Sequence, residues 1–147
     1  MKGCRYALPV LLPRLALVLV MVQVARAQRN EAFPLPPPPP NTLSVREAKM
    51  LVAKTNSLSN LLRLAFAYYA ARQFSSAAST FKKLIKSVPP KTPIRKTMAF
   101  GLSYSLVGLG HFREAAVQLE NTASLFAKSS RSYLYADAGR CYWILGL

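Results

Sequence analysis

Acidic residues are scarce in this chain of 147 residues, which has five Asp and Glu against 20 Lys and Arg and a formal net charge of +15. Five widely spaced acids provide no paired carboxylates for general acid–base catalysis. Two cysteines exclude a disulfide scaffold, and a single histidine without a CxxCH motif excludes a His-rich metal site or a haem. We therefore expect no cofactor, no metal and no enzymatic activity from these residues.

The first 27 residues have the composition of an export signal. Lys2, Arg5 and Arg14 precede a ten-residue apolar run at 15–24, and Ala25-Arg26-Ala27 follows it. This order predicts a secretory signal peptide at 1–27 that is cleaved after Ala27, and hence a periplasmic or secreted protein. The run is shorter than the roughly 20 residues of a membrane span, although an uncleaved anchor remains an alternative.

Cleavage would change both the charge and the thiol content. Four of the 20 bases and none of the five acids lie in 1–27, so the net charge would fall to +11. Cys141 would be the one remaining cysteine, and we expect it to be buried because free cysteines usually are.

Residues 28–43 form a proline-rich linker that contains five consecutive prolines, Pro36–Pro40. Such a run favours a stiff polyproline II conformation that rises about 3 Å per residue. It is typical of a spacer or of a ligand for an SH3-type groove. We favour the spacer, because an exported chain seldom meets SH3 domains.

Helix-forming residues dominate from 44 to the end, and no segment alternates with a period of two, so we expect an all-α fold. Ser44 and Glu47 form a capping box that opens a helix within 44–57. Thr92 and Pro93 are predicted as the N-cap and first residue of a later helix. The other predicted helices cover 58–71, 75–87, 112–127 and 132–145, with the helix after Thr92 running to 107.

Parts of the sequence repeat at spacings between 36 and 38 residues. The segment at 72–78 is similar to the segment at 110–116, and Leu109-Gly110 recurs as Leu145-Gly146. A period in this range indicates a repeat protein. The motifs of the tetratricopeptide repeat are W-x₂-L-G-x₂-Y, A-x₃-F and a closing P. They are matched by Leu61-x₂-Leu64-Ala65-x₂-Tyr68, Ala77-x₃-Phe81 and Pro89, then by Ala99-x₂-Leu102-Ser103-x₂-Leu106 and Ala115-x₃-Leu119, and finally by Tyr135-x₂-Ala138-Gly139-x₂-Tyr142.

The chain thus resembles the tetratricopeptide repeat family, which implies a right-handed superhelical α-solenoid of antiparallel helix pairs. Unit one would cover 58–91, unit two 96–129 and a partial third unit 132–147. Ala65 and Ala77 would lie where the paired helices approach closely. A plain helical bundle and a solenoid of the Sel1 type remain alternatives.

The resemblance also implies a concave groove that binds another protein or a peptide segment. The positions that line the groove in the family correspond here to a set rich in aromatic residues with one arginine. Such residues are common in binding hot spots. Some of them could instead be core between repeats. The set is Leu62, Phe66, Tyr69, Phe100, Tyr104, Val107, Tyr133, Arg140 and Trp143.

The positive charge is concentrated where units one and two meet, in a stretch of 66 residues between Glu47 and Glu114 that has no acid. Cations near a helix C-terminus are partly explained by its dipole. The cluster also suggests a patch for anionic lipid or an acidic polymer, and export argues against nucleic acid. His111 and Glu114 are predicted to be a solvated pair. The basic cluster is Lys82, Lys83, Lys86, Lys91, Arg95 and Lys96.

The sequence ends on an apolar segment, 142–147, where a partner helix would begin in a complete unit. Three interpretations remain open: a fragment of a longer repeat protein, a homodimer through the last helix, or a last helix that folds back as a cap. The function that we predict is that of an exported scaffold module, serving an envelope assembly such as those of a Gram-negative periplasm. The alternatives are the anion-binding surface and the N-terminal fragment of a larger protein.

Overall fold

The computed structural model of this chain describes residues 33–147. The chain divides into two compact units, Met1–Pro34 and Leu35–Leu147, and every element described below belongs to the second. The predicted signal peptide and the first residues of the predicted linker lie outside the described residues.

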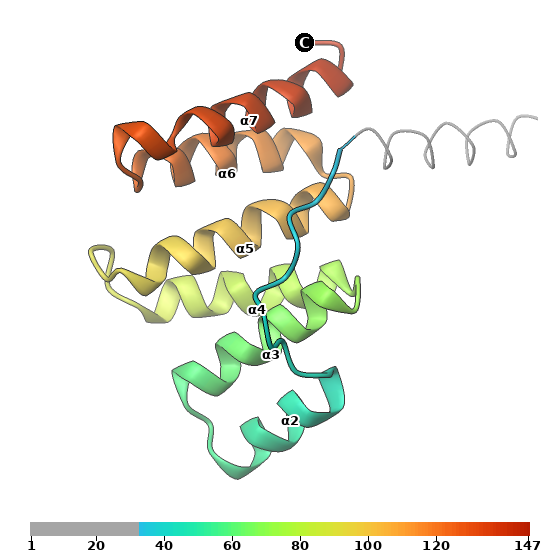
Figure 1. Cartoon of the computed structure of the whole chain (residues 1–147), viewed down its shortest axis with the longest axis vertical. Coiled ribbons are helices and arrows are strands. Elements are labelled where there is room, and N and C mark those ends of the chain that lie inside the picture. The colour runs from blue at the N-terminus through green and yellow to red at the C-terminus, as the bar shows by residue number, and fades with distance from the viewer. Residues whose placement is uncertain (1–32) are drawn as a thin grey trace, which may run out of the picture. The chain divides into compact units, whose positions relative to one another are not determined.

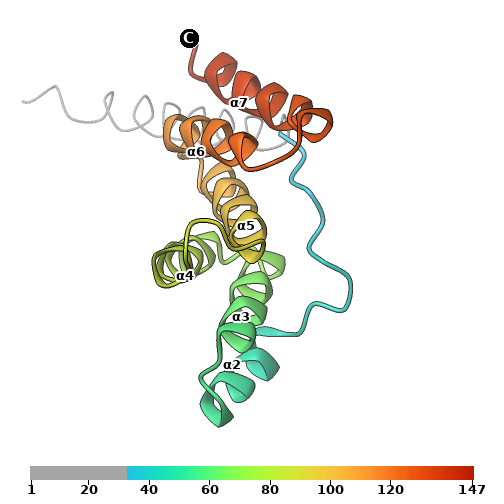
Figure 2. The same ribbon diagram turned by 90° about the vertical axis from the view of Figure 1, so that its left-hand side faces the viewer.

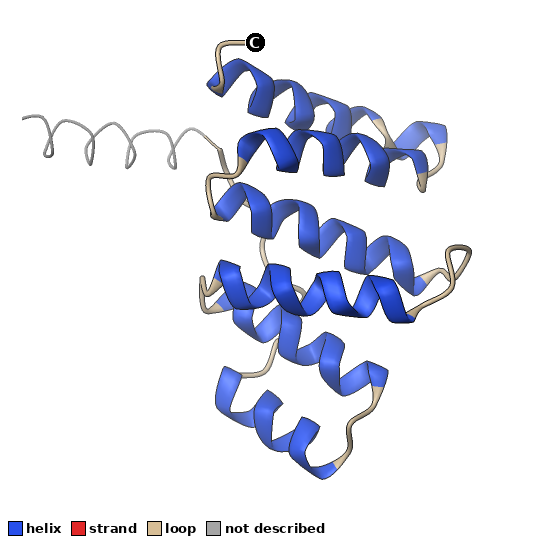
Figure 3. Ribbon diagram, turned by 180° about the vertical axis from the view of Figure 1, so that it is seen from behind, coloured by secondary structure: helices blue, strands red, loops and turns tan. Residues whose placement is uncertain are grey.

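Helices make up most of the second unit (Figure 3). No strand occurs between residues 33 and 147, so the prediction of an all-α fold is confirmed. The helices are α2 (Val45–Lys54), α3 (Leu58–Ala70), α4 (Phe74–Ser87), α5 (Ile94–Gly108), α6 (Phe112–Ser124) and α7 (Ser132–Ile144), with a 3₁₀ turn at Lys128–Ser130.

Within this unit the helices follow one another in chain order from α2 to α7 (Figure 1). Each packs mainly against the next one along the chain, and α3 also contacts α5. In the side view α4 and α6 lie on one side, while the segment that precedes α2 runs along the other (Figure 2). That segment therefore lies on the side of α3, α5 and α7.

Side-chain hydrogen bonds explain where α2 begins and how its end is joined to α3. The Ser44 hydroxyl accepts from the Glu47 amide at 3.3 Å, and the Glu47 carboxylate accepts from the Ser44 amide at 3.0 Å, which confirms the predicted capping box. Hydrogen bonds from the Ser44 side chain and backbone lower the pKa of Glu47. Asn60 donates to the carbonyls of Leu51 and Thr55, so it joins the end of α2 to the start of α3.

The same turn ends α3, α5 and α7. Each turn contains one residue with positive φ, namely Arg72 (56°) after α3, Gly110 (75°) after α5 and Gly146 (73°) after α7. In each case the amide of the next residue donates to the carbonyl five positions earlier. These hydrogen bonds run from 73 to 68 at 2.9 Å, from 111 to 106 at 3.0 Å and from 147 to 142 at 3.0 Å. This is the Schellman arrangement, which satisfies carbonyls at the end of a helix. The spacing of the turns, 38 and 36 residues, is the spacing of the sequence repeat.

The start of α5 differs from the prediction that Thr92 is its N-cap. Pro93 occupies that position with helical angles, and no side chain caps the helix. The carbonyls of Thr92 and Pro93 instead accept from Arg95 and Lys96, at 3.0 and 3.1 Å. These hydrogen bonds join residues three positions apart, as in a 3₁₀ helix, and tighten the first turn. The α-helix therefore starts after the proline.

The core is packed around small residues that allow close approach of the helices. Ala65 and Ala77 are both fully buried, as their place in the repeat predicts. The ring of Phe81 is also fully buried and meets Phe66 edge to face, with centroids 5.1 Å apart. A β-carbon added to Gly101 would lie 2.3 Å from that ring, so only glycine allows α5 to pack this closely against α4.

Candidate binding groove

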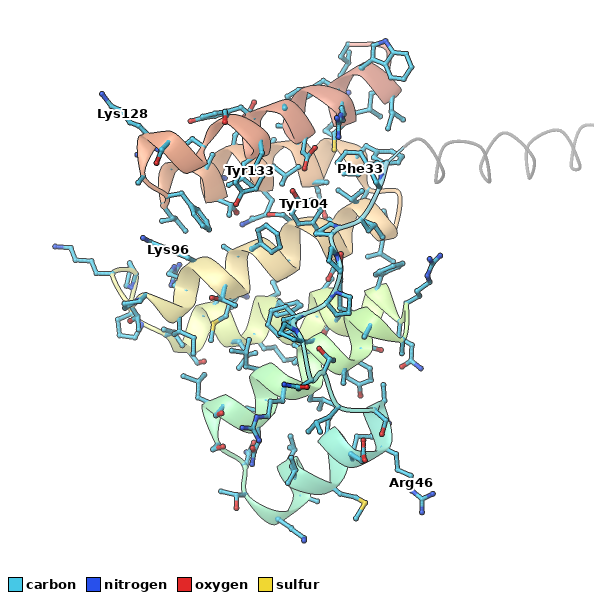
Figure 4. The ribbon with its side chains drawn as sticks, viewed as in Figure 1. Phe33, Arg46, Lys96, Tyr104, Lys128 and Tyr133 are labelled. Carbon is cyan, nitrogen blue, oxygen red and sulfur yellow. The ribbon has the colours of Figure 1, made fainter. Side chains whose placement is uncertain are left out.

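A groove of about 600 Å³ runs between the proline segment and the side chains of α3, α5 and α7. Its size is typical of ligand sites, and its lining is mainly aromatic and apolar. Figure 4 shows Tyr104 and Tyr133, which come from α5 and α7, between these two helices. The groove is lined by Pro37–Pro40, Phe66, Tyr69, Pro93, Lys96, Thr97, Phe100, Gly101, Tyr104, Phe126 and Tyr133.

Tyr69 attaches the proline segment to α3. Its hydroxyl donates to the carbonyl of Pro36 at 2.9 Å, across 33 positions of sequence. Burial of the side chain raises the pKa of Tyr69 to about 12, so the hydroxyl remains a donor even in mildly alkaline solution. Phe74 supports the ring edge to face, with centroids 5.7 Å apart.

Tyr104 connects α5 to α7 at the floor of the groove. Its hydroxyl donates to Asp137 at 2.5 Å, and the other carboxylate oxygen of Asp137 accepts from Arg140 at 3.1 Å. Burial, with the nearby Asp137 carboxylate, raises the pKa of Tyr104 well above its usual range. The ring centroids of Phe100 and Tyr104 are 4.6 Å apart and the rings are tilted, so two aromatic side chains lie side by side on α5.

One cation lies at the edge of the groove. The ammonium of Lys96 is 5.8 Å from the centre of the Phe126 ring, within the range of a cation–π contact. A second hollow of about 590 Å³ shares Pro39, Pro40, Phe66 and Thr97 with the groove and extends it toward Leu62 and Arg63.

The structure brings together Phe66, Tyr69, Phe100, Tyr104 and Tyr133 from the predicted groove set, and Leu62 lines the adjoining hollow. The other three residues of the set lie outside both hollows. Val107 is buried in the core and lines neither hollow, since α5 is packed on more than one side. Arg140 is held by Asp137, and Trp143 is 75% exposed and lines neither hollow.

Sequence reasoning missed two parts of the groove. It interpreted Pro36–Pro40 as a spacer and did not expect contact with the helices, but in the structure Pro36 accepts a hydrogen bond from Tyr69 and the next four prolines line the groove. It also missed Phe126, which follows α6. A run of prolines beside a chain rich in tyrosine was the available signal, because aromatic surfaces accept proline rings.

The six residues of the predicted basic cluster have different surroundings in the structure. Arg95 donates to the carbonyls of Ile85 and Val88, at 2.9 and 2.7 Å, and so caps the end of α4. Lys96 lies at the groove, whereas Lys82 lines a separate hollow that also contains Glu114. Four lysines remain exposed on α4 and the turn that follows it: Lys82, Lys83, Lys86 and Lys91.

The remaining candidate residues have structural explanations. His111 and Glu114 form the expected solvated pair, with 3.9 Å between Nδ1 and Oε2 and both side chains mostly exposed. Cys141 is fully buried, as predicted, and burial raises the pKa of its thiol to about 11. Between residues 33 and 147, no three His, Cys, Asp or Glu side chains are grouped so as to hold a metal ion.

Comparison with protein-family models gives no match, and no significant similarity is found to curated proteins or to solved structures. The resemblance to the tetratricopeptide repeat is thus supported by the residues and turns of this chain alone. None of the helices in the described part of the chain is long and apolar enough to cross a membrane.

Proposed function

We propose that this chain is an exported, non-enzymatic interaction module of the tetratricopeptide type that holds another protein in the groove. In this proposal 58–91 and 96–129 are two helix-pair units, 132–147 begins a third, and the units stack as a right-handed α-solenoid. The three Schellman turns at spacings of 38 and 36 residues support the repeat. Export would bring the module to an envelope assembly.

The observation that carries the binding proposal is the aromatic groove itself. Phe66, Phe100 and Tyr133 come from three different helices and line one hollow. Aromatic side chains supply large contact areas at low entropic cost, which is why they are common in binding hot spots. A hollow lined from several repeats also allows an extended partner to contact each repeat in turn.

Tyr133 offers a sharp test because it is 43% exposed and lines the groove. A photoreactive benzoylphenylalanine at 133 should cross-link a protein partner in the native host. The matched control is the same residue at 117, since Val117 is 48% exposed and lines the hollow of Lys82 rather than the groove. Circular dichroism would confirm that both variants fold.

The expected result is a discrete cross-linked product from position 133 that position 117 does not give. The same products from both positions, or none from position 133, would contradict a partner in the groove. Substitution of Tyr104 is less informative, because that side chain is 2% exposed and its loss would disturb the contact with α7.

A further inference from the structure

The proline segment lies along the groove and forms one of its walls, as a bound peptide would. Pro36 accepts a hydrogen bond from the Tyr69 hydroxyl, and the four prolines that follow line the same hollow as Phe66 and Phe100. The contact joins residues 33 positions apart, so chain connectivity does not impose it. The chain's own segment therefore shows which chemistry this surface accepts.

That chemistry suits proline-rich segments. Proline has no amide hydrogen, so a run of prolines offers carbonyl acceptors and ring surfaces but no backbone donors. The groove presents the complementary groups, namely a side-chain hydroxyl donor and the faces of aromatic rings. Apart from the proline segment, its walls are mainly helices, whose backbone hydrogen bonds are made internally, so the described residues offer no strand edge there to which a partner could add. Grooves lined with aromatic residues bind polyproline II segments because this conformation is already ordered before binding.

The proline segment does not fill the space available to it. About 600 Å³ remains between the prolines and the aromatic side chains Phe100, Phe126 and Tyr133. The rings of Phe100 and Tyr104 adjoin there, with centroids 4.6 Å apart, so aromatic surface continues beyond the segment's own contacts.

We propose that the groove binds a proline-rich segment of another protein in the polyproline II conformation, and that residues 35–40 are its intramolecular competitor. This inference rests on the proposed function and names the chemical class of the partner. The internal segment is attached to α2 by the short connection at 41–44. Such a short tether maintains an effective concentration in the millimolar range, so a separate peptide of the same sequence must compete against it.

The probe is a fluorescein-labelled peptide with the sequence of residues 34–42, titrated into the full chain and followed by fluorescence anisotropy. In a variant in which Pro36–Pro40 are replaced by alternating glycine and serine, we expect at least about tenfold tighter binding than in the wild type, because the competitor is lost. Circular dichroism of both proteins would show that the helices are retained.

Two tyrosines on α3 provide matched variants in that glycine–serine background. Tyr69→Phe removes the hydroxyl donor and should weaken the probe's affinity by about threefold to tenfold, the range for one neutral hydrogen bond. Tyr68→Phe should leave the affinity unchanged, because Tyr68 does not line the groove and its ring lies 5.9 Å from the ammonium of Lys49.

Three results would overturn the proposal: no binding of the probe to the glycine–serine variant, equal binding of a peptide whose prolines are changed to alanine, or equal affinities in the Tyr69→Phe and Tyr68→Phe variants. These outcomes are distinguishable from failure of the proposed function. A partner cross-linked at 133 without affinity for the proline probe would leave the interaction module intact and remove only its proline specificity.

Discussion

α5 and α7 end in the same turn, 36 residues apart, yet they are packed very differently. Nine residues of α5 are buried, against three of α7. Val107 is 3% exposed, whereas Trp143, at the same place before its turn, is 75% exposed. α5 packs against α3, α4 and α6, and α7 packs mainly against α6. The number of neighbouring helices, rather than the residue pattern, decides which side chains become core.

The largest difference between the two helices should come from their glycines. Gly101→Ala places a methyl group against the fully buried ring of Phe81, so we expect a loss of about 3 kcal/mol in the free energy of unfolding. Gly139 has nothing within 4 Å of an added β-carbon, so Gly139→Ala should gain up to about 1 kcal/mol from helix propensity. Chemical denaturation of both variants measures the two effects, and the same sign for both would contradict the comparison.

A smaller contrast is expected at the positions before the turns. Val107→Ala removes two methyl groups from the core and should cost about 2 kcal/mol. Trp143→Ala should change the free energy of unfolding by less than about 0.5 kcal/mol, because the ring is mostly in solvent. A large loss for Trp143→Ala would show that the outer side of α7 is covered in solution.

The third prediction concerns the inner side of α7, where Leu134, Ala138 and Cys141 are buried. Since burial raises the pKa of the Cys141 thiol from 9 to about 11, its thiolate at pH 8 should be about 100-fold rarer than in the unfolded chain. In a Cys4→Ser background, modification by a disulfide reagent should be slower in the folded protein by at least that factor.

The same shift has a consequence for stability with a definite sign. The raised pKa contributes stability that is fully present below about pH 9 and is lost as the pH rises toward 11. The Cys141→Ala variant should lack this part of the decline, which urea denaturation across that pH range can measure. Identical pH profiles for the two proteins would contradict a buried thiol.

Local features were the most predictable from sequence. The capping box at Ser44 and Glu47, the end of a helix at 87, and the break between α5 and α6 depend on neighbouring residues, so the sequence predicts them well. The burial of Ala65 and Ala77 was expected from their place in the repeat, and that of Cys141 because free cysteines are usually buried. Five of the nine groove residues that the resemblance implied line one hollow.

Long-range features were not predictable in the same way. Arg95 was counted in a basic cluster, but its guanidinium caps α4 because the turn at 88–93 brings it to those carbonyls. Val107 and Trp143 were assigned to one binding surface from equivalent positions in the repeat. Their burial differs because burial depends on neighbours that a repeat pattern does not specify.

The proline segment separates most clearly what sequence determines from what tertiary structure decides. Sequence alone determined that Pro36–Pro40 would be stiff, because each ring fixes its own backbone angle. It also determined the helical class of the rest, through capping residues, periodicity and turns. Only the tertiary structure decided that the segment lies on Tyr69 rather than in solvent. That choice depends on a contact across 33 residues, whose partners become neighbours only when the helices have packed.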